Sequence, residues 1–155
     1  MPKPRPKHDR RHPVHGVKDT AERPTIVFLT VCTKDRRPWL ATAQHHELLT
    51  RIWKSATAWH AGRYVLMPDH LHIFATPDED ALPFDNWVRY WKSQFSKAHA
   101  NPVLRWQVDH WDRRLRSSES YEEKSQYMWE NPVRAGLVQR AEDWPYQGEV
   151  FELPW

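Results

Sequence analysis

The stretch VLMPDHLHIF, at positions 65–74, decides the fold. It joins two short apolar runs, RYVLMP and HLHIFAT, at Pro68-Asp69, a residue pair that favours a tight turn. The pattern predicts a β-hairpin. Because side chains alternate along a strand, His70 and His72 project from the same face, and the hairpin places two imidazoles side by side.

Upstream of the hairpin, the β-branched run TIVFLTVCT predicts a strand at 25–33. Apolar residues then recur at helical spacing and predict an amphipathic helix at 42–60. Thr42 is expected to cap this helix and Gly62 to stop it.

Downstream, an apolar stripe with basic residues outside it predicts a helix at 82–100, and a further strand is expected within 105–117. Ser120 and Glu123 have the spacing of a capping box, which opens a helix that carries Tyr121, Tyr127 and Met128.

Asn131-Pro132 followed by Gly136 predicts the cap, first turn and end of one more short helix. The order β-α-β-β-α-β-α predicts an α+β fold. Its antiparallel sheet carries its helices mainly on one face.

The bulk composition favours one intracellular domain at 25–155. The chain has 155 residues and a single cysteine, Cys32, so a thiolate zinc cage is excluded and any metal ligands are oxygen or imidazole. The sequence contains no apolar run long enough to span a membrane, which predicts a cytoplasmic protein. A DNA partner would make it nucleoid-associated.

The N-terminal residues 1–24 are rich in Pro, Lys, Arg and His, and the net charge of the chain is +3. This composition predicts a basic, flexible arm that suits a polyanion, although a solvated tail without a partner has the same composition. The ten tryptophans are expected mostly in the core, with some available to stack on unpaired bases.

The histidine pair has two interpretations. Either the two histidines are structural, or they are two ligands of a metal site. Burying imidazoles on a central strand without partners costs free energy, which favours the metal site. Tyr127 and Asn131 are four apart and share a helical face, so they offer a phenol nucleophile and an amide oxygen ligand. Equally, Tyr127 suits a core aromatic and Asn131 a helix cap.

The motifs YVLMPDHLHIF, WQ (106–107), YMWENPVRAGLV (from Tyr127) and EDWPY (from Glu142) together resemble the REP-associated tyrosine transposases, relatives of the single-tyrosine HUH transposases. The resemblance covers about 25–146. It implies a ferredoxin-like sheet with the nucleophile on a following helix. Many relatives carry Asp-His where this chain has Asp112-Arg113, which leaves the role of the second residue open.

The resemblance implies that His70, His72 and Asn131 bind a divalent metal, Mg²⁺ or Mn²⁺, although the ligand chemistry alone also admits Zn²⁺. It implies that Tyr127 cleaves single-stranded DNA at hairpin-forming repeats through a 5′-phosphotyrosine intermediate, as a monomer or homodimer. Exposed cations are the candidates for DNA contact, and each also suits an ordinary solvated charge. These are Arg89, Lys92, Arg113, Arg114, Arg116 and Arg134.

Two other functions fit the same residues. A catalytically silent protein derived from a transposase would bind hairpin DNA without forming an adduct. A metal phosphodiesterase would use activated water, and its cleavage would not depend on Tyr127.

Overall fold

The computed structural model describes residues 24–155, so the predicted arm at 1–24 lies outside the described residues except for Pro24. The strands are β1 (Val27–Thr33), β2 (Trp59–Leu66), β3 (His70–Pro77), β4 (Trp106–Arg114) and β5 (Gln147–Glu149). The helices are α2 (Ala43–Ser55), α3 (Phe84–His99), α4 (Tyr121–Trp129) and α5 (Asn131–Arg134), with the short 3-10 helices η2 (Lys34–Arg36) and η3 (Ala141–Asp143). Within this part of the chain, no helix has the length and apolar character needed to cross a membrane.

The strands form one antiparallel sheet in the order β4-β1-β3-β2-β5. The predicted hairpin is confirmed, because β2 pairs with β3 and places Val65 opposite His72. β1 pairs with the other side of β3, so the strand that carries both histidines is central. The β-α-β-β-α-β order of the first four strands confirms the ferredoxin-like α+β fold.

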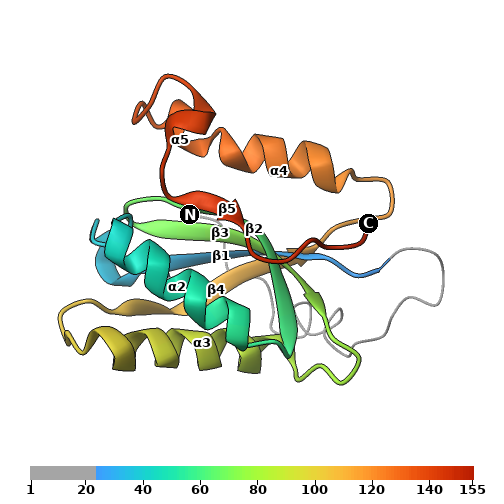
Figure 1. The fold of residues 1–155 in the computed structure, drawn as a ribbon, viewed down its shortest axis with the longest axis horizontal. Coiled ribbons are helices and arrows are strands. Elements are labelled where there is room, and N and C mark those ends of the chain that lie inside the picture. The colour runs from blue at the N-terminus through green and yellow to red at the C-terminus, as the bar shows by residue number, and fades with distance from the viewer. Residues whose placement is uncertain (1–23) are drawn as a thin grey trace.

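Helices cover both faces of the sheet (Figure 1). α2 and α3 pack on one face, where Trp53, Trp87 and Trp91 belong to the larger core. α4 lies on the opposite face, where Tyr121 and Met128 belong to a second core. This arrangement confirms two helices on one face and an added helix that carries Tyr127.

Two helix starts are fixed by local sequence, as predicted. The Thr42 hydroxyl accepts a hydrogen bond from the backbone N–H of His45 at 3.1 Å. The Ser120 hydroxyl accepts one from the N–H of Glu123, also at 3.1 Å. Each bond satisfies an amide that has no partner within the first helical turn.

All ten tryptophans are buried or half-buried. Their rings pack edge to face, as in the contact of Trp53 with Trp91 at 5.5 Å between ring centres. The tryptophans therefore build the core. Among the described residues, the exposed aromatic side chains are Tyr90 and Tyr127.

The helix predicted at 42–60 is wrong at its C-terminal end. α2 ends at Ser55, and Trp59 already belongs to β2, where it pairs with Pro77. The Trp59 indole is fully buried and donates from Nε1 to the Leu82 carbonyl at 2.7 Å. This tertiary packing stabilises an extended backbone in a segment whose apolar spacing also suits a helix.

Gly62 does not stop a helix but lies inside β2. A Cβ at this position would lie 2.5 Å from Leu153 Cδ1 and 2.7 Å from Tyr121 Oη. The glycine therefore allows α4 and the C-terminal segment to approach the sheet closely.

The sequence does not predict β5. Its three residues pair with β2, with Glu149 opposite Arg63 and Gln147 opposite Val65. Gly148 lies against the Tyr64 ring, where a Cβ would be 2.8 Å from the phenolic oxygen. This strand depends on tertiary contacts, because Gln, Gly and Glu have little intrinsic preference for strands.

We expect Gly62→Ala to lower the free energy of unfolding by about 1–3 kcal/mol, because the new methyl group overlaps Leu153 and the Tyr121 hydroxyl. Urea unfolding followed by tryptophan fluorescence measures the change. In a Leu153→Ala background the same substitution should cost less. An equal cost in both backgrounds would contradict the proposed overlap.

Candidate active site

His70 and His72 occupy the start of the central strand β3 and face the side of the sheet that α4 covers. Phe74, two residues further along the same face, belongs to the core that includes Met128 of α4. The two imidazole rings are edge to face with their centres 4.9 Å apart, and Phe28 of β1 stacks on His72 at 5.1 Å. The predicted side-by-side placement of the imidazoles is confirmed.

Hydrogen bonds engage the Nδ1 atom of both imidazoles. His70 Nδ1 lies 2.7 Å from Asp69 Oδ1, and Asp69 Oδ2 accepts a hydrogen bond from Arg36 Nε at 3.0 Å. His72 Nδ1 lies 2.9 Å from the hydroxyl oxygen of Thr30, the residue opposite it on β1. Because Asp69 engages Nδ1 of His70, Nε2 is the ring nitrogen left to bind a ligand. Partners of this kind orient histidines that bind metals.

The charges of His72 and Asp69 suit the binding of a metal cation. Burial, together with the nearby His70, Arg134 and Arg36, lowers the pKa of His72 to about 3, so this imidazole is neutral near pH 7. Burial alone would raise the pKa of Asp69, but hydrogen bonds from His70 and Arg36 lower it overall. His72 is therefore a neutral imidazole, and the ionised carboxylate of Asp69 orients His70.

Tyr127 lies on α4 with 66% of its surface exposed. The helix is held to the sheet by Tyr121, Ser125 and Met128, which are buried at the spacing of one helical face. Tyr127 precedes Met128 and is turned away from that face. The interpretation as a buried core aromatic is therefore wrong.

Arg134 connects Tyr127 with Asn131. Its guanidinium lies over the Tyr127 ring, 4.0 Å from the centre, and its Nη2 donates to the Tyr127 carbonyl at 2.9 Å. The same nitrogen donates to Asn131 Oδ1 at 2.9 Å. One side chain therefore positions both the tyrosine and the amide.

Asn131 does not cap α5. The cap position is Glu130, and Asn131 is the first helical residue, whose Nδ2 donates to the Met128 carbonyl at 2.9 Å. Glu130 keeps a helical backbone, so α5 follows α4 too closely for Asn131 to adopt the extended conformation of a cap. The predicted end of the helix is confirmed, since Gly136 has a φ of +76°.

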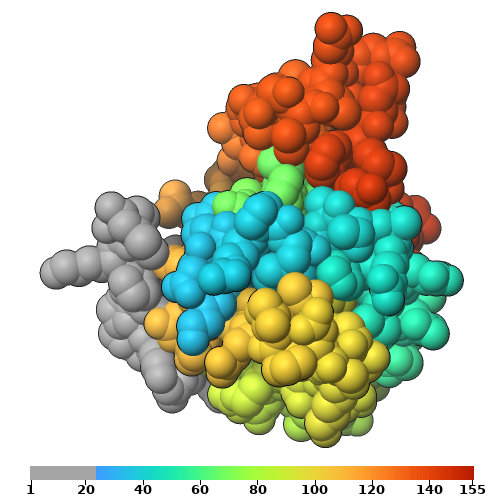
Figure 2. Space-filling model, turned by 90° about the vertical axis from the view of Figure 1, so that its left-hand side faces the viewer, coloured from blue at the N-terminus to red at the C-terminus, as the bar shows by residue number. Residues whose placement is uncertain are grey.

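Three of the predicted catalytic and metal-binding residues line one cavity of about 220 Å³, and they come from three elements: His72 from β3, Tyr127 from α4 and Asn131 from α5. Phe28, Phe74, Arg113, Lys124 and Met128 also line it. His70 does not line this cavity, but its ring contacts that of His72. In the view of Figure 2, the orange and red segment with α5 rises above the body of the molecule, and the green β2–β3 turn lies at its base.

The donor set fits a divalent cation. Two imidazole Nε2 atoms and the Asn131 oxygen are the ligands available near the cavity, and Nδ1 of each histidine is already engaged. Two neutral nitrogens and an amide leave coordination positions open for water and a phosphate oxygen. Asn131 Oδ1 retains a second lone pair beside its bond to Arg134.

The predicted DNA-contacting cations do not form one surface. Arg113 and Arg134 lie near the cavity, but Arg113 is paired with Glu119 by two hydrogen bonds of 3.1 Å, which hold the pKa of Glu119 at about 2. Arg114 and Arg116 are exposed at and just after the end of β4.

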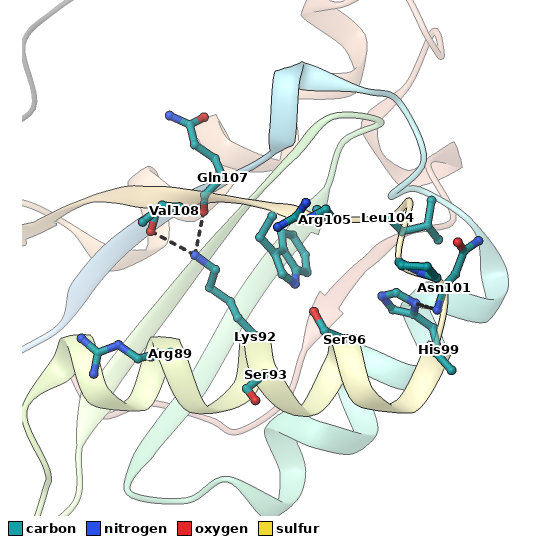
Figure 3. A pocket seen from close by; sticks show the side chains of 13 residues that line it. Arg89, Lys92, Ser93, Ser96, His99, Asn101, Leu104, Arg105, Gln107 and Val108 are labelled. Atoms are coloured by element: carbon teal, nitrogen blue, oxygen red, sulfur yellow. Dashed lines mark hydrogen bonds between the residues drawn. The ribbon is translucent and has the colours of Figure 1, made fainter.

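Arg89 and Lys92 lie elsewhere, in a groove of about 800 Å³ between α3 and β4 (Figure 3). Lys92 points across this groove, and its Nζ donates to the Gln107 carbonyl at 2.8 Å. The groove also contains Arg105 and the WQ pair at 106–107, and it provides a second basic surface.

The supporting residues Thr30, Arg36 and Asp69 were not predicted from the sequence. Thr30 depends on the register between β1 and β3, and Arg36 on the position of η2 beside the hairpin turn. Asp69 directly precedes His70, and that adjacency was the only local signal.

The chain is similar to known transposases. It is 31% identical over 121 residues to the REP-associated tyrosine transposase of Escherichia coli K12, which covers 77% of this chain and 73% of that protein. A candidate REP-associated tyrosine transposase of Haemophilus influenzae is 24% identical over 110 residues, covering 58% and 62%. No model of a known protein family matches the chain.

Two solved structures share the fold. A REP-associated tyrosine transposase bound to a REP hairpin superimposes with a TM-score of 0.69 and 24% identity, covering 85% of this chain and 90% of that one. A candidate transposase from Deinococcus radiodurans R1 gives a TM-score of 0.50 at 16% identity, covering 82% and 95%. From its identity to the Escherichia coli protein, and in agreement with its fold, the chain belongs to the REP-associated tyrosine transposases.

Proposed function

We propose that this transposase cleaves single-stranded DNA at hairpin-forming repeats, with Tyr127 as the nucleophile. The observation that carries the proposal is the convergence of Tyr127, His72 and Asn131 on one cavity. A solved relative was captured with a REP hairpin, which supports hairpin DNA as the substrate class.

In this mechanism, the Tyr127 hydroxyl oxygen attacks a phosphodiester phosphorus. The O3′–P bond breaks, the upstream strand leaves with a 3′-OH, and the downstream strand stays attached as a 5′-phosphotyrosine. The phenolic proton passes to solvent, to which Tyr127 is exposed. Because the link retains the phosphodiester energy, a second 3′-OH can attack it and transfer the strand without ATP.

Arg134 is the positioning residue in this proposal. Its guanidinium stacks on the Tyr127 ring and donates to the Asn131 side-chain oxygen. The nucleophile and the proposed metal ligand therefore keep a fixed position relative to each other. The charge of Arg134 favours a phosphate near the cavity, whereas Lys124, which lines the cavity, is paired with Glu119 at 3.4 Å.

His70, His72 and Asn131 would hold a divalent ion, Mg²⁺ or Mn²⁺. When bound, such an ion polarises a phosphate oxygen and offsets negative charge in the transition state. The chain itself supplies the orientation: Thr30 and Asp69 fix the two imidazoles, and Phe28 stacks against His72.

The groove between α3 and β4, on the side of the sheet opposite the histidines, would contact a part of the DNA away from the cleaved phosphate. Arg89, Lys92 and Arg105 provide phosphate contacts there, and Tyr90 is the exposed aromatic of α3.

Tyr127→Phe should abolish the covalent adduct, a loss on the order of 10³-fold or more, because the attacking oxygen is removed. The assay is a denaturing gel with 3′-labelled hairpin DNA from repeats flanking the gene, in Mn²⁺ or Mg²⁺. His70→Ala should also remove the band at the combined mass of protein and DNA.

The same gel separates the alternatives. Cleavage that persists in Tyr127→Phe would indicate a phosphodiesterase that uses water. Tight binding by the wild type without any adduct would favour a silent DNA-binding protein.

Arg134→Ala should slow adduct formation about 10–100-fold in single turnover, because Tyr127 and Asn131 lose their shared partner. Arg134→Lys should rescue little, since an ammonium cannot stack and donate in the same geometry. Arg140→Ala is the matched control, because Arg140 is a solvent-exposed arginine in the same part of the chain. Equal rates in Arg134→Ala and Arg140→Ala would exclude the positioning role.

Lys92→Gln should remove one phosphate contact and so reduce the slope of log K against log salt concentration for hairpin binding by about 1. Lys97→Gln on the same helix is the control and should leave the slope unchanged. Burial lowers the pKa of Lys92 to about 8, so its charge is present at pH 7 and is lost as the pH rises to 9. The difference between wild type and Lys92→Gln should therefore shrink from pH 7 to pH 9. A constant difference would argue against a charge contact.

A further inference from the structure

A second cluster of metal-ligating side chains lies on the other face of the sheet. Asp85 is in the first turn of α3, and His110 and Asp112 are two apart on β4, so both strand residues face α3. His110 packs against Phe84 of the larger core, at 6.2 Å between ring centres. The cluster is therefore separated by the sheet from His70 and His72.

The three side chains are close enough to share one ion. Their candidate ligand atoms all lie within 4.8 Å of one another. His110 Nε2 is 3.0 Å from Asp85 Oδ1 and 3.3 Å from Asp112 Oδ2. Two ligands that are each about 2.1 Å from a common ion lie roughly 3.0–3.4 Å apart, so these separations match a coordination sphere.

Asp112 indicates that something besides the protein satisfies this cluster. It is 3% exposed, and within residues 24–155 neither of its carboxylate oxygens has a hydrogen-bond partner. A buried carboxylate without hydrogen bonds is strongly unfavourable. His110 forms an ion pair with Asp112 at 3.3 Å, and it is shared with Asp85, which lies closer, at 3.0 Å.

The charge balance favours a divalent ion over a proton. His110 lies between Asp85 and Asp112, so a proton on it is shared by both carboxylates, whereas a divalent ion would contact each of them directly.

The cluster is accessible. A cavity of about 150 Å³ is lined by Asp85 and His110, together with Asp109, Arg89 and Lys92, so an ion can reach two of the three ligands from this cavity. It shares Arg89 and Lys92 with the groove of Figure 3.

We propose that Asp85, His110 and Asp112 bind a divalent transition-metal ion of the Mn²⁺ or Zn²⁺ type, which joins the start of α3 to β4. One imidazole and two carboxylates are a donor set that first-row transition ions accept. The ion fixes the two elements that form the basic groove, and the site does not depend on the chemistry proposed for Tyr127.

The test counts Mn²⁺ ions bound to the full chain by electron paramagnetic resonance of free Mn²⁺. Mn²⁺ is the probe because His8, His12 and His15 near the N-terminus offer imidazoles that Zn²⁺ would occupy. The background is His70→Ala/His72→Ala, which removes the active-site donors and separates this proposal from the proposed function.

In that background we expect one Mn²⁺ per chain, and Asp112→Asn should weaken its binding by at least about tenfold. Asp109→Asn is the matched control, since Asp109 lies on the same strand and lines the same cavity without belonging to the cluster. It should leave Mn²⁺ binding unchanged. Absence of bound Mn²⁺ in the background, or equal binding by Asp112→Asn, would overturn the proposal.

A thermal unfolding experiment distinguishes loss of the metal site in Asp112→Asn from loss of folding. Without metal, Asp112→Asn should be at least as stable as its background, because it removes a buried charge. Added Mn²⁺ should raise the Tm of the background and not that of Asp112→Asn. If Asp112→Asn fails to fold, His110→Gln serves in its place with the same expected loss.

Discussion

The pairing of β3 on both sides constrains the whole proposed active site. β1 and β2 fix its register, and a slip by one residue would move both histidines to the face covered by α2 and α3. The same register sets Thr30 opposite His72, where its hydroxyl meets Nδ1. Strand pairing therefore determines the face on which the imidazoles lie and also the nitrogen that His72 presents.

The second constraint is the attachment of α4. Tyr121, Ser125 and Met128 bury one side of this helix, so the neighbouring Tyr127 must lie at the boundary between core and solvent. A nucleophile needs this position, because it must reach a polymer substrate while staying beside the ligands on the sheet. Arg134 completes the arrangement, since the short α5 returns its guanidinium over the tyrosine ring.

The structural features that were predicted correctly from the sequence depend on local interactions. The hairpin, the Thr42 and Ser120 caps and the stop at Gly136 all depend on neighbours within a few residues, and the structure contains each of them. The predicted Asn131 cap is a local error, because α5 follows α4 directly. The other errors occur where tertiary contacts decide. Burial of Trp59 converts a helix-like pattern into the start of β2, and Gly62 is required by side chains from distant segments.

The contrast between local and tertiary interactions also applies to the residues of the proposed active site. Alternation along β3 was enough to place His70 and His72 together, and helical spacing linked Tyr127 with Asn131, but the role of each came from the family resemblance. Thr30 could not be predicted, because it lies 42 residues from His72 and only the strand register brings them together.

β4 connects the two sites through the alternation of its side chains. Arg113 reaches the cavity beneath α4, whereas His110 and Asp112 face α3. The carboxylates of the second cluster lie beside a groove that carries Arg89 and Lys92, and negative charge there opposes binding of a polyanion. A divalent ion on the cluster would remove that opposition. Binding of the ion and binding of DNA in the groove would then strengthen each other by the same factor, because coupling between two binding equilibria is reciprocal.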